Sequence, residues 1–175
     1  MRSSVLERCT IIRAQSWAIP DSAPVAAEQA LTLQWPMRIG TVAVGRANVA
    51  CVGPTDWLVI APAERESAAL LKALTEAFAG SSFRATDVSS ALVRIHLEGD
   101  QVRTLLSQGC GIDFHPQRFP PGLATRTRFA GLAVVLWCTG TTSFECIVAR
   151  SYEDYLLAWL ADAGGDRPSG VALQD

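Results

Sequence analysis

Alternating polar and apolar residues are clearest in the segment ALVRIHL near the middle of the chain. Val93, Ile95 and Leu97 fall on one side, whereas Arg94 and His96 fall on the other. A period of two residues is that of an extended chain with one face buried. The pattern therefore predicts a strand with one face in the core.

Shorter runs of apolar and β-branched residues predict further strands. They are Cys9–Arg13, two or three strands within 40–61 that end with Trp57–Ala61, Ser82–Asp87, Thr125–Ala130, Leu132–Cys138 and Phe144–Ala149. The last three follow one another closely, with Gly131 and Gly140 at the expected turns. We expect these three strands to form an antiparallel meander.

A different spacing predicts four helices. Leu70, Leu71, Leu74 and Phe78 share one face of a helix that begins near Pro62 and ends at Gly80. A second helix is predicted from Pro24 to Leu31, with Asp21-Ser22 as its cap, and a third over 101–107. A fourth is predicted from a Ser151 cap to Gly164, with Glu153 and Asp154 in its first turn. Its apolar face consists of Tyr155, Leu156, Trp159 and Leu160.

The predicted order is β-α-β-β-α-β followed by β-α-β-β-β-α, which is typical of the α+β class. We expect two similar halves of antiparallel sheet with packed helices, as in a duplicated unit. The halves would span residues 1–86 and 87–163 of one compact unit, with a flexible tail at 164–175. Residues 1–8 are expected to form a loose arm.

The segment 109–129, GCGIDFHPQRFPPGLATRTRF, does not fit a helix or a buried strand. It holds three of the nine prolines and one of the two histidines. It also carries bulky side chains that a plain linker would lack: Ile112, Phe114, Phe119 and Leu123. We interpret it as an ordered loop that binds a ligand or docks on a partner.

Composition bears on the partners. The chain of 175 residues is 49% hydrophobic and only 18% charged. Either another chain covers part of its exterior, or its composition is simply rich in Ala, Val and Leu. A formal net charge of −2 argues against nucleic acid as the partner.

Cysteine usage and the chain start indicate a compartment. Five widely spaced cysteines show no zinc-type spacing, so we expect reduced core thiols. The start MRSSVLERCT lacks a secretory signal pattern, and no apolar run approaches the ~20 residues of a membrane span. A cytoplasmic location is expected.

Motifs for nucleotide, phosphate or metal chemistry were not found in the sequence. His96 and His115 are expected to be structural, and Asp87 and Asp113 to form turns. The arginines have two open interpretations: a pocket for a carboxylate or phosphate, or a solvated or paired face. They are Arg118, Arg126, Arg128 and Arg150.

The five tryptophans divide into two groups. Trp57, Trp137 and Trp159 lie in predicted elements and are expected in the core. Trp17 and Trp35 lie in irregular segments, so they are the candidates for partner contact, because Trp often anchors interfaces.

Three phrases resemble one family in order along the chain. They are GPTDWLVIAP at 53–62, the block 87–137 that contains the 109–129 loop, and FECIVARSYEDYLLAWL at 144–160. Together they resemble the gamma subunit of heterotetrameric sarcosine oxidase. The resemblance implies a fold like the folate-binding domain of aminomethyltransferases.

The resemblance also implies a function. The enzyme, an oxidoreductase acting on CH–NH donors, converts sarcosine to glycine, 5,10-methylenetetrahydrofolate and hydrogen peroxide. FAD, FMN, NAD, tetrahydrofolate and zinc are expected in the alpha, beta and delta subunits, and none in this chain. In aminomethyltransferase relatives a strand glutamate holds the pterin; Glu145 lies in the comparable position, but we expect it to pair with an arginine.

We therefore expect a non-catalytic assembly subunit, with Asp113, His115, Arg118 and Arg126 of the loop as partner contacts. Two alternatives remain: the gamma-type subunit of a related N-methyl amino acid dehydrogenase, and a stand-alone module that binds a folate or another one-carbon carrier.

Overall fold

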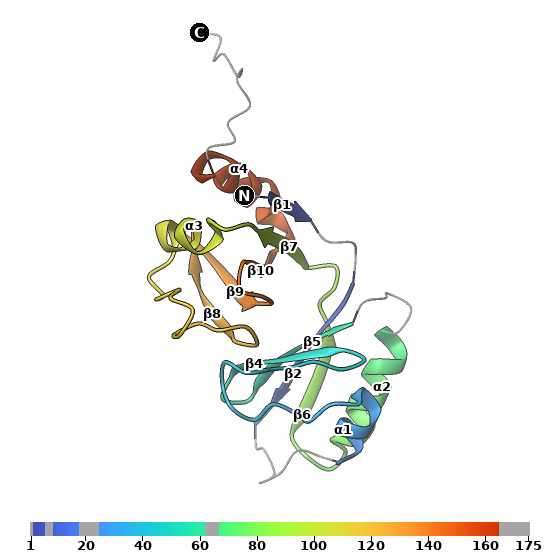
Figure 1. Cartoon of the computed structure of the whole chain (residues 1–175). Helices are drawn as coiled ribbons and strands as arrows, with labels where there is room; N and C mark the ends of the chain where they lie inside the picture. The colour runs from blue at the N-terminus through green and yellow to red at the C-terminus, as the bar shows by residue number, and fades with distance from the viewer. Residues whose placement is uncertain (1, 6–8, 18–24, 62–66, 165–175) are drawn as a thin grey trace.

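The computed structural model describes residues 2–5, 9–17, 25–61 and 67–164, which form two antiparallel sheets of five strands each. Figure 1 shows the sheets one above the other, with a pair of helices outside each. The expected α+β class with two similar halves is confirmed.

The first sheet has the strand order β3-β4-β5-β2-β6. Its elements are β2 (Thr10–Ser16), α1 (Val25–Leu31), β3 (Val42–Ala43), β4 (Asn48–Gly53), β5 (Asp56–Ala61), α2 (Ser67–Ala77) and β6 (Phe83–Asp87). The second sheet has the order β1-β7-β10-β9-β8. Its elements are β1 (Arg2–Val5), β7 (Leu92–Glu98), α3 (Val102–Gly109), β8 (Ala124–Phe129), β9 (Leu132–Cys138), β10 (Ser143–Ala149), the 3-10 turn η2 (Arg150–Tyr152) and α4 (Glu153–Ala163).

The two sheets have the same layout. In the first half the chain runs β2, α1, β3, β4, β5, α2 and β6; in the second it runs β7, α3, β8, β9, β10 and α4. The place of β6 beside β2 is taken, in the second sheet, by β1 beside β7. The second half is thus completed by a strand from the start of the chain.

The N-terminal segment was predicted wrongly as a loose arm. Arg2 lies opposite Glu98, and Val5 lies opposite Ile95, in an antiparallel ladder. Four residues with little apolar character give no strand signal of their own, so pairing with the free edge of β7 decides their conformation. The boundary between two halves at residues 86 and 87 stays a prediction. Strand β1 belongs to the predicted first half by sequence, but it pairs within the sheet of the second half.

Three apolar cores hold the layers together. The first lies between the first sheet and helices α1 and α2, around Trp57 and Leu74. The second lies between the second sheet and helices α3 and α4, around Phe144 and Leu106. The third lies between the two sheets. The order of layers is therefore helices, sheet, sheet, helices (Figure 1).

Strand β7 follows the predicted alternation. Val93, Ile95 and Leu97 are buried in the helix-side core, whereas Arg94 and His96 are partly exposed. The predicted face of α2 is also found, with Leu70 and Leu74 buried. Gly80, at φ +86°, follows this helix in the left-handed conformation expected after a helix end.

The start of the last helix differs from the prediction. Ser151 lies in the 3-10 turn, and the residue before α4 is Tyr152, which makes no side-chain capping bond. Tyr155 is 52% exposed, so it does not belong to the buried face of Leu156 and Leu160. The local sequence favoured a cap at Ser151. In the structure Ser151 is inside the 3-10 turn η2, which connects β10 to α4, so the α-helix begins two residues later.

Some predictions lie outside the described residues. These are the Asp21-Ser22 cap, the helix start at Pro62 and the tail beyond Gly164. Within the part of the chain that the structure describes, no helix has the length and apolar character needed to cross a membrane.

Candidate functional site

The loop between α3 and β8 is held in place by Arg103, a residue that the sequence did not single out. Its guanidinium donates hydrogen bonds to the carbonyls of Phe114 (2.7 Å), Phe119 (3.0 Å) and Thr141 (2.9 Å). The same group lies 4.9 Å from the centre of the Phe144 ring. One planar cation thus fixes both sides of the loop.

Aromatic packing explains the bulky residues of this loop. Phe114 and Phe119 are buried, and their rings lie 5.7 Å apart and about 6 Å from Phe144 of β10. Ile112 and Leu123 pack against the same core. The ordered loop predicted from these side chains is confirmed.

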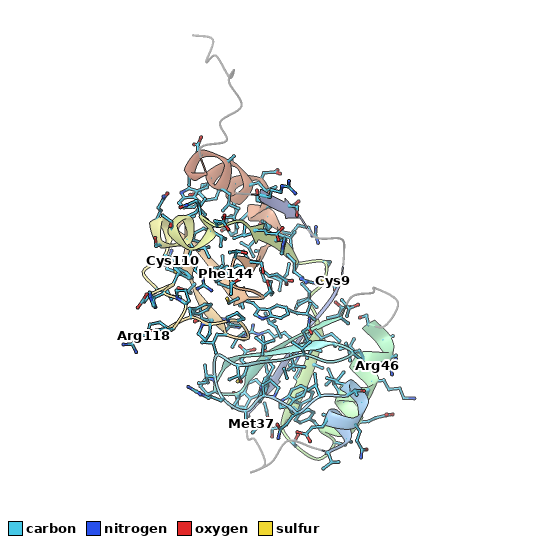
Figure 2. All side chains as sticks on the ribbon, viewed as in Figure 1. Cys9, Met37, Arg46, Cys110, Arg118 and Phe144 are labelled. Atoms are coloured by element: carbon cyan, nitrogen blue, oxygen red, sulfur yellow. The ribbon has the colours of Figure 1, made fainter. Side chains whose placement is uncertain are left out.

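The polar residues of the loop shape its outer surface. The Asp113 carboxylate accepts a hydrogen bond from the backbone N–H of His115 at 2.9 Å, and the His115 carbonyl accepts bonds from the N–H groups of Arg118 and Phe119. Both serve the turn, as predicted. Asp113, His115 and Arg118 are exposed, and Figure 2 shows Arg118 reaching outward from the loop.

The end of the loop also joins the two halves. Gly122 accepts a hydrogen bond from the N–H of Val42 (3.0 Å), and Ala124 donates to the carbonyl of Gly40 (2.8 Å). Thr41 and Leu123 form an isolated antiparallel bridge. The edge strands β3 and β8 of the two sheets therefore meet at this point.

The four arginines do not gather into one pocket. Arg126 binds Asp56 of the first half, and Arg128 donates to the carbonyl of Gly131. Arg150 donates to the carbonyls of Ser89, Ser90 and Leu92. A pocket made of all four is therefore not present; the partners of Arg126 and Arg150 lie far away in the sequence, that of Arg128 lies three residues away, and Arg118 is exposed.

Glu145 pairs with Arg94, as predicted. The two side chains face one another across β10 and β7, with contacts of 2.7 and 2.9 Å that use both carboxylate oxygens. Their side chains are 10% and 13% exposed. Burial alone would lower the pKa of Arg94, but hydrogen bonding and charge from Glu145, together with Cys9, outweigh burial, so the pKa is raised. The pair is a buried, charge-balanced element of the sheet.

A second ionic cluster links the two halves. Asp56, at the start of β5, accepts bonds from Arg13 of β2 (2.7 and 3.0 Å) and from Arg126 of β8 (3.0 Å). Burial favours a higher pKa for the Asp56 carboxyl, but the bonds from Arg13 and the charge of Arg126 prevail, so the pKa is lowered. Asp56 therefore carries a negative charge at neutral pH between two guanidinium groups.

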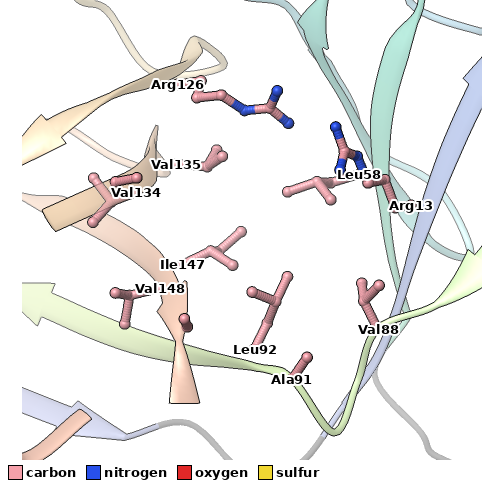
Figure 3. Close-up of a pocket in the computed structure, with 12 residues that line it drawn as sticks. Arg13, Leu58, Val88, Ala91, Leu92, Arg126, Val134, Val135, Ile147 and Val148 are labelled. Carbon is pink, nitrogen blue, oxygen red and sulfur yellow. The ribbon is translucent and has the colours of Figure 1, made fainter. Parts of the chain in front are cut away.

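Beside this cluster lies a cleft of about 340 Å³, lined by residues of both sheets. Figure 3 shows Arg13 and Arg126 at one end and apolar side chains along the remaining walls. The walls include Leu58 of the first sheet and Leu92 and Ile147 of the second. No pattern in the sequence indicated this cleft, because its walls come from six strands and one turn spread over both halves.

Trp17 and Trp35, the two proposed contact residues, differ in burial. Trp17 is 79% exposed, which agrees with a contact role. Trp35 is 3% exposed and packs against Trp57 (5.6 Å) and Phe78 (5.4 Å), so its assignment to the surface was wrong. An irregular backbone does not prevent burial when the side chain can enter a core formed by distant elements.

The cysteines lie in the cores. All five are buried and free. Burial raises the pKa of the Cys146 thiol to about 12, which makes it a poor nucleophile. Among the residues that the structure describes, no three His, Cys, Asp or Glu side chains come together as a metal site.

Comparison with known proteins agrees with this architecture. Residues 16–166 match the model of the sarcosine oxidase, gamma subunit family. Sarcosine oxidase subunit gamma of Corynebacterium sp. (strain P-1) is 32% identical over 149 residues, which covers 83% of this chain and 72% of the relative. The same subunit of an Arthrobacter species is also 32% identical, with the same coverage.

Solved structures show the same fold. A chain of the heterotetrameric sarcosine oxidase from Corynebacterium sp. U-96, in complex with pyrrole 2-carboxylate, aligns with a TM-score of 0.83 and 26% identity, over 97% of this chain and 86% of that one. The glycine cleavage aminomethyltransferase of Bartonella henselae aligns with a TM-score of 0.65 at 11% identity, over 91% of this chain and 45% of that one, which is a likeness of fold alone. From its sequence and its fold together, this chain belongs to the sarcosine oxidase gamma subunit family.

Proposed function

We propose that this chain is the non-catalytic gamma subunit of a heterotetrameric sarcosine oxidase. The complex would demethylate sarcosine to glycine and form 5,10-methylenetetrahydrofolate and hydrogen peroxide. The observation that carries the proposal is the alignment of 97% of the chain with a chain of such a heterotetramer at a TM-score of 0.83. Its role would be to support assembly.

The geometry of the site supports a non-catalytic role. Three carboxylates of the site are occupied by structural bonds: Glu145 binds Arg94, Asp56 binds two arginines, and Asp113 accepts a bond within its turn. A catalytic acid or base needs a free path to the substrate. In this proposal FAD, FMN, NAD, tetrahydrofolate and zinc are held by the alpha, beta and delta subunits of a cytoplasmic complex.

Exposed residues supply candidate contacts with those subunits. Trp17 presents an indole ring to solvent, and the 109–129 loop presents Asp113, His115 and Arg118. A rigid backbone under such side chains lowers the entropy cost of binding. Arg126, the remaining predicted contact, is partly exposed, and one of its nitrogens already binds Asp56.

Co-expression tests the proposal. The chain is produced with the alpha, beta and delta subunits, and the complex is isolated by size-exclusion chromatography and assayed for peroxide formation with sarcosine. We expect all four chains in one peak, and a loss of complex when this chain is omitted. Full activity from the other three chains, with this chain eluting separately, would refute the assembly role.

Two alternatives have less support. A related N-methyl amino acid dehydrogenase would use a similar gamma subunit, and its substrate preference in the assay above would reveal it. A folate-binding role through Glu145 requires a free carboxylate, yet both of its oxygens accept bonds from Arg94. Calorimetry of the isolated chain with tetrahydrofolate tests that role, and we expect no heat of binding.

A further inference from the structure

The cleft between the two sheets combines an apolar interior with an unbalanced positive charge. Of the twelve residues drawn in Figure 3, all except Arg13 and Arg126 are apolar. Its volume of about 340 Å³ lies within the range of small-molecule sites, which is roughly 300–1,000 Å³. A space of this size can hold a compact ligand but not a folded element of another protein.

The charge at its end follows from the Asp56 cluster. Arg13 and Arg126 each carry one positive charge, and they share one carboxylate, so the cluster has one positive charge in excess. Among the described residues that line the cleft, none is acidic. An anion at this end would balance the cluster.

The two arginines also retain donors for such an anion. A guanidinium has five N–H groups. Arg13 uses its Nε and Nη2 atoms toward Asp56, and Arg126 uses Nη1. Their side chains are 40% and 44% exposed, so the remaining N–H groups are open to a ligand. Asp56 holds both groups in place, which lowers the entropy cost of binding.

We propose that this cleft is a binding site for a small monocarboxylate with an apolar body. The carboxylate would accept hydrogen bonds from Arg13 and Arg126, and the apolar body would lie along Leu58, Leu92, Val135 and Ile147. Planar guanidinium groups suit a carboxylate, and the apolar walls disfavour ligands with a second charge. The site goes beyond the assembly role and does not depend on it.

Three probes of eight carbon atoms that differ in the charge of the head group test the recognition of charge. They are octanoate, octan-1-ol and octylamine, each titrated by calorimetry into the full-length chain. We expect octanoate to bind roughly tenfold or more tightly than octan-1-ol, which is the factor that about 1.4 kcal/mol provides. Octylamine should bind most weakly. Equal binding of octanoate and octan-1-ol, or no binding of octanoate, would overturn the proposal.

Variants test the location. Arg126→Gln should bring octanoate binding close to that of octan-1-ol, whereas Arg126→Lys should retain part of the difference. Ala91→Trp, at an exposed wall position, should block both ligands without touching the arginines. Arg118→Gln removes an exposed arginine that is absent from the cleft lining and should change nothing. Unchanged octanoate binding in both Arg126→Gln and Ala91→Trp would refute the site.

A last experiment distinguishes between two occupants of the cleft: a free small molecule and a segment of a partner chain. The same titration is repeated with the assembled complex. We expect octanoate to bind there as it binds the isolated chain. Loss of binding on assembly would show that a partner covers the cleft, and would contradict the small-molecule proposal.

Discussion

Asp56 and Glu145 occupy the same position in the two halves of the chain. Each lies on the strand that pairs with the first strand of its half, and each binds an arginine of that strand through both oxygens. In both halves the arginine, Arg13 or Arg94, lies opposite the residue two positions after the acid. The similarity of the two halves therefore extends to an ion pair with the same register.

The two pairs differ in their surroundings. Arg94 is 13% exposed and Arg13 is 40% exposed, and only the Asp56 pair gains a second arginine, Arg126. The Glu145 pair is closed and balanced in charge. The Asp56 pair is open and has a positive charge in excess, so the two equivalent positions serve different purposes.

Replacing Glu145 by glutamine should strongly destabilise the chain. The variant keeps the shape of the side chain but leaves the Arg94 charge buried without its partner. Removing one partner of a buried pair costs about 3–5 kcal/mol, which urea unfolding can measure. Glu76→Gln, in the exposed Lys72–Glu76 pair, is the control and should cost under about 0.5 kcal/mol. Equal losses in the two variants would contradict the burial argument.

The acid limb of the stability curve should depend on Asp56. Its pKa is lowered in the folded state, so its stabilising contribution is complete above the unfolded value of about 3.9 and disappears as pH falls through the lower folded value. Asp56→Asn should flatten this limb and lower the free energy of unfolding at pH 7 by about 1.5–3 kcal/mol.

Arg126→Gln supplies the matched test of this pH dependence. It removes one of the groups that lower the Asp56 pKa, so the folded and unfolded pKa values of this carboxyl lie closer together. The loss of stability on acidification should still begin near the unfolded value, but it should be smaller and should end at a higher pH than in the unmodified chain. Unfolding curves between pH 2 and 7 measure both variants. An acid limb that is the same in all three proteins would exclude Asp56 as its source.

Trp35 and Trp17 should respond in opposite ways to replacement by alanine. Trp35→Ala empties a place in the first core and should cost about 3–5 kcal/mol of stability. Trp17→Ala should cost under about 0.5 kcal/mol but weaken assembly with the other subunits, roughly tenfold or more if the ring is an interface anchor. Denaturation of the isolated chain and affinity measurements on the complex separate the two effects. Unchanged assembly of Trp17→Ala would remove Trp17 from the interface.

Arg103 should control the order of the 109–129 loop. Arg103→Ala leaves the carbonyls of Phe114 and Phe119 without their donor, so hydrogen exchange across residues 112–121 should rise and stability should fall by more than about 2 kcal/mol. Arg103→Lys should rescue little, because one ammonium cannot reproduce the planar fork. Arg118→Ala, on the same loop but exposed, is the control and should leave the exchange unchanged.

Strand β1 should protect the edge of β7. Ser4 lies opposite His96, and Ser4→Pro prevents regular pairing there, so hydrogen exchange across residues 92–98 should rise. Ser4→Thr, which favours a strand, should retain the protection. Equal protection in both variants would mean that β1 contributes little to the sheet.

The sequence by itself determined most elements of this protein. Alternation in the segment ALVRIHL and the period of Leu70, Leu74 and Phe78 reflect local geometry, which each residue and its near neighbours set. The similar layout of two halves also follows from the order of such elements. Turn residues such as Asp113 could be identified because their bonds reach only two residues away.

Tertiary structure alone decided the rest. Strand β1 forms because the edge of β7 is open, Trp35 is buried because Trp57 and Phe78 leave room for its ring, and Arg126 meets Asp56 seventy residues away. These contacts depend on how the two sheets stack, and no local pattern encodes that stacking. The same stacking creates the cleft, since a cavity exists only where surfaces from separate strands fail to meet.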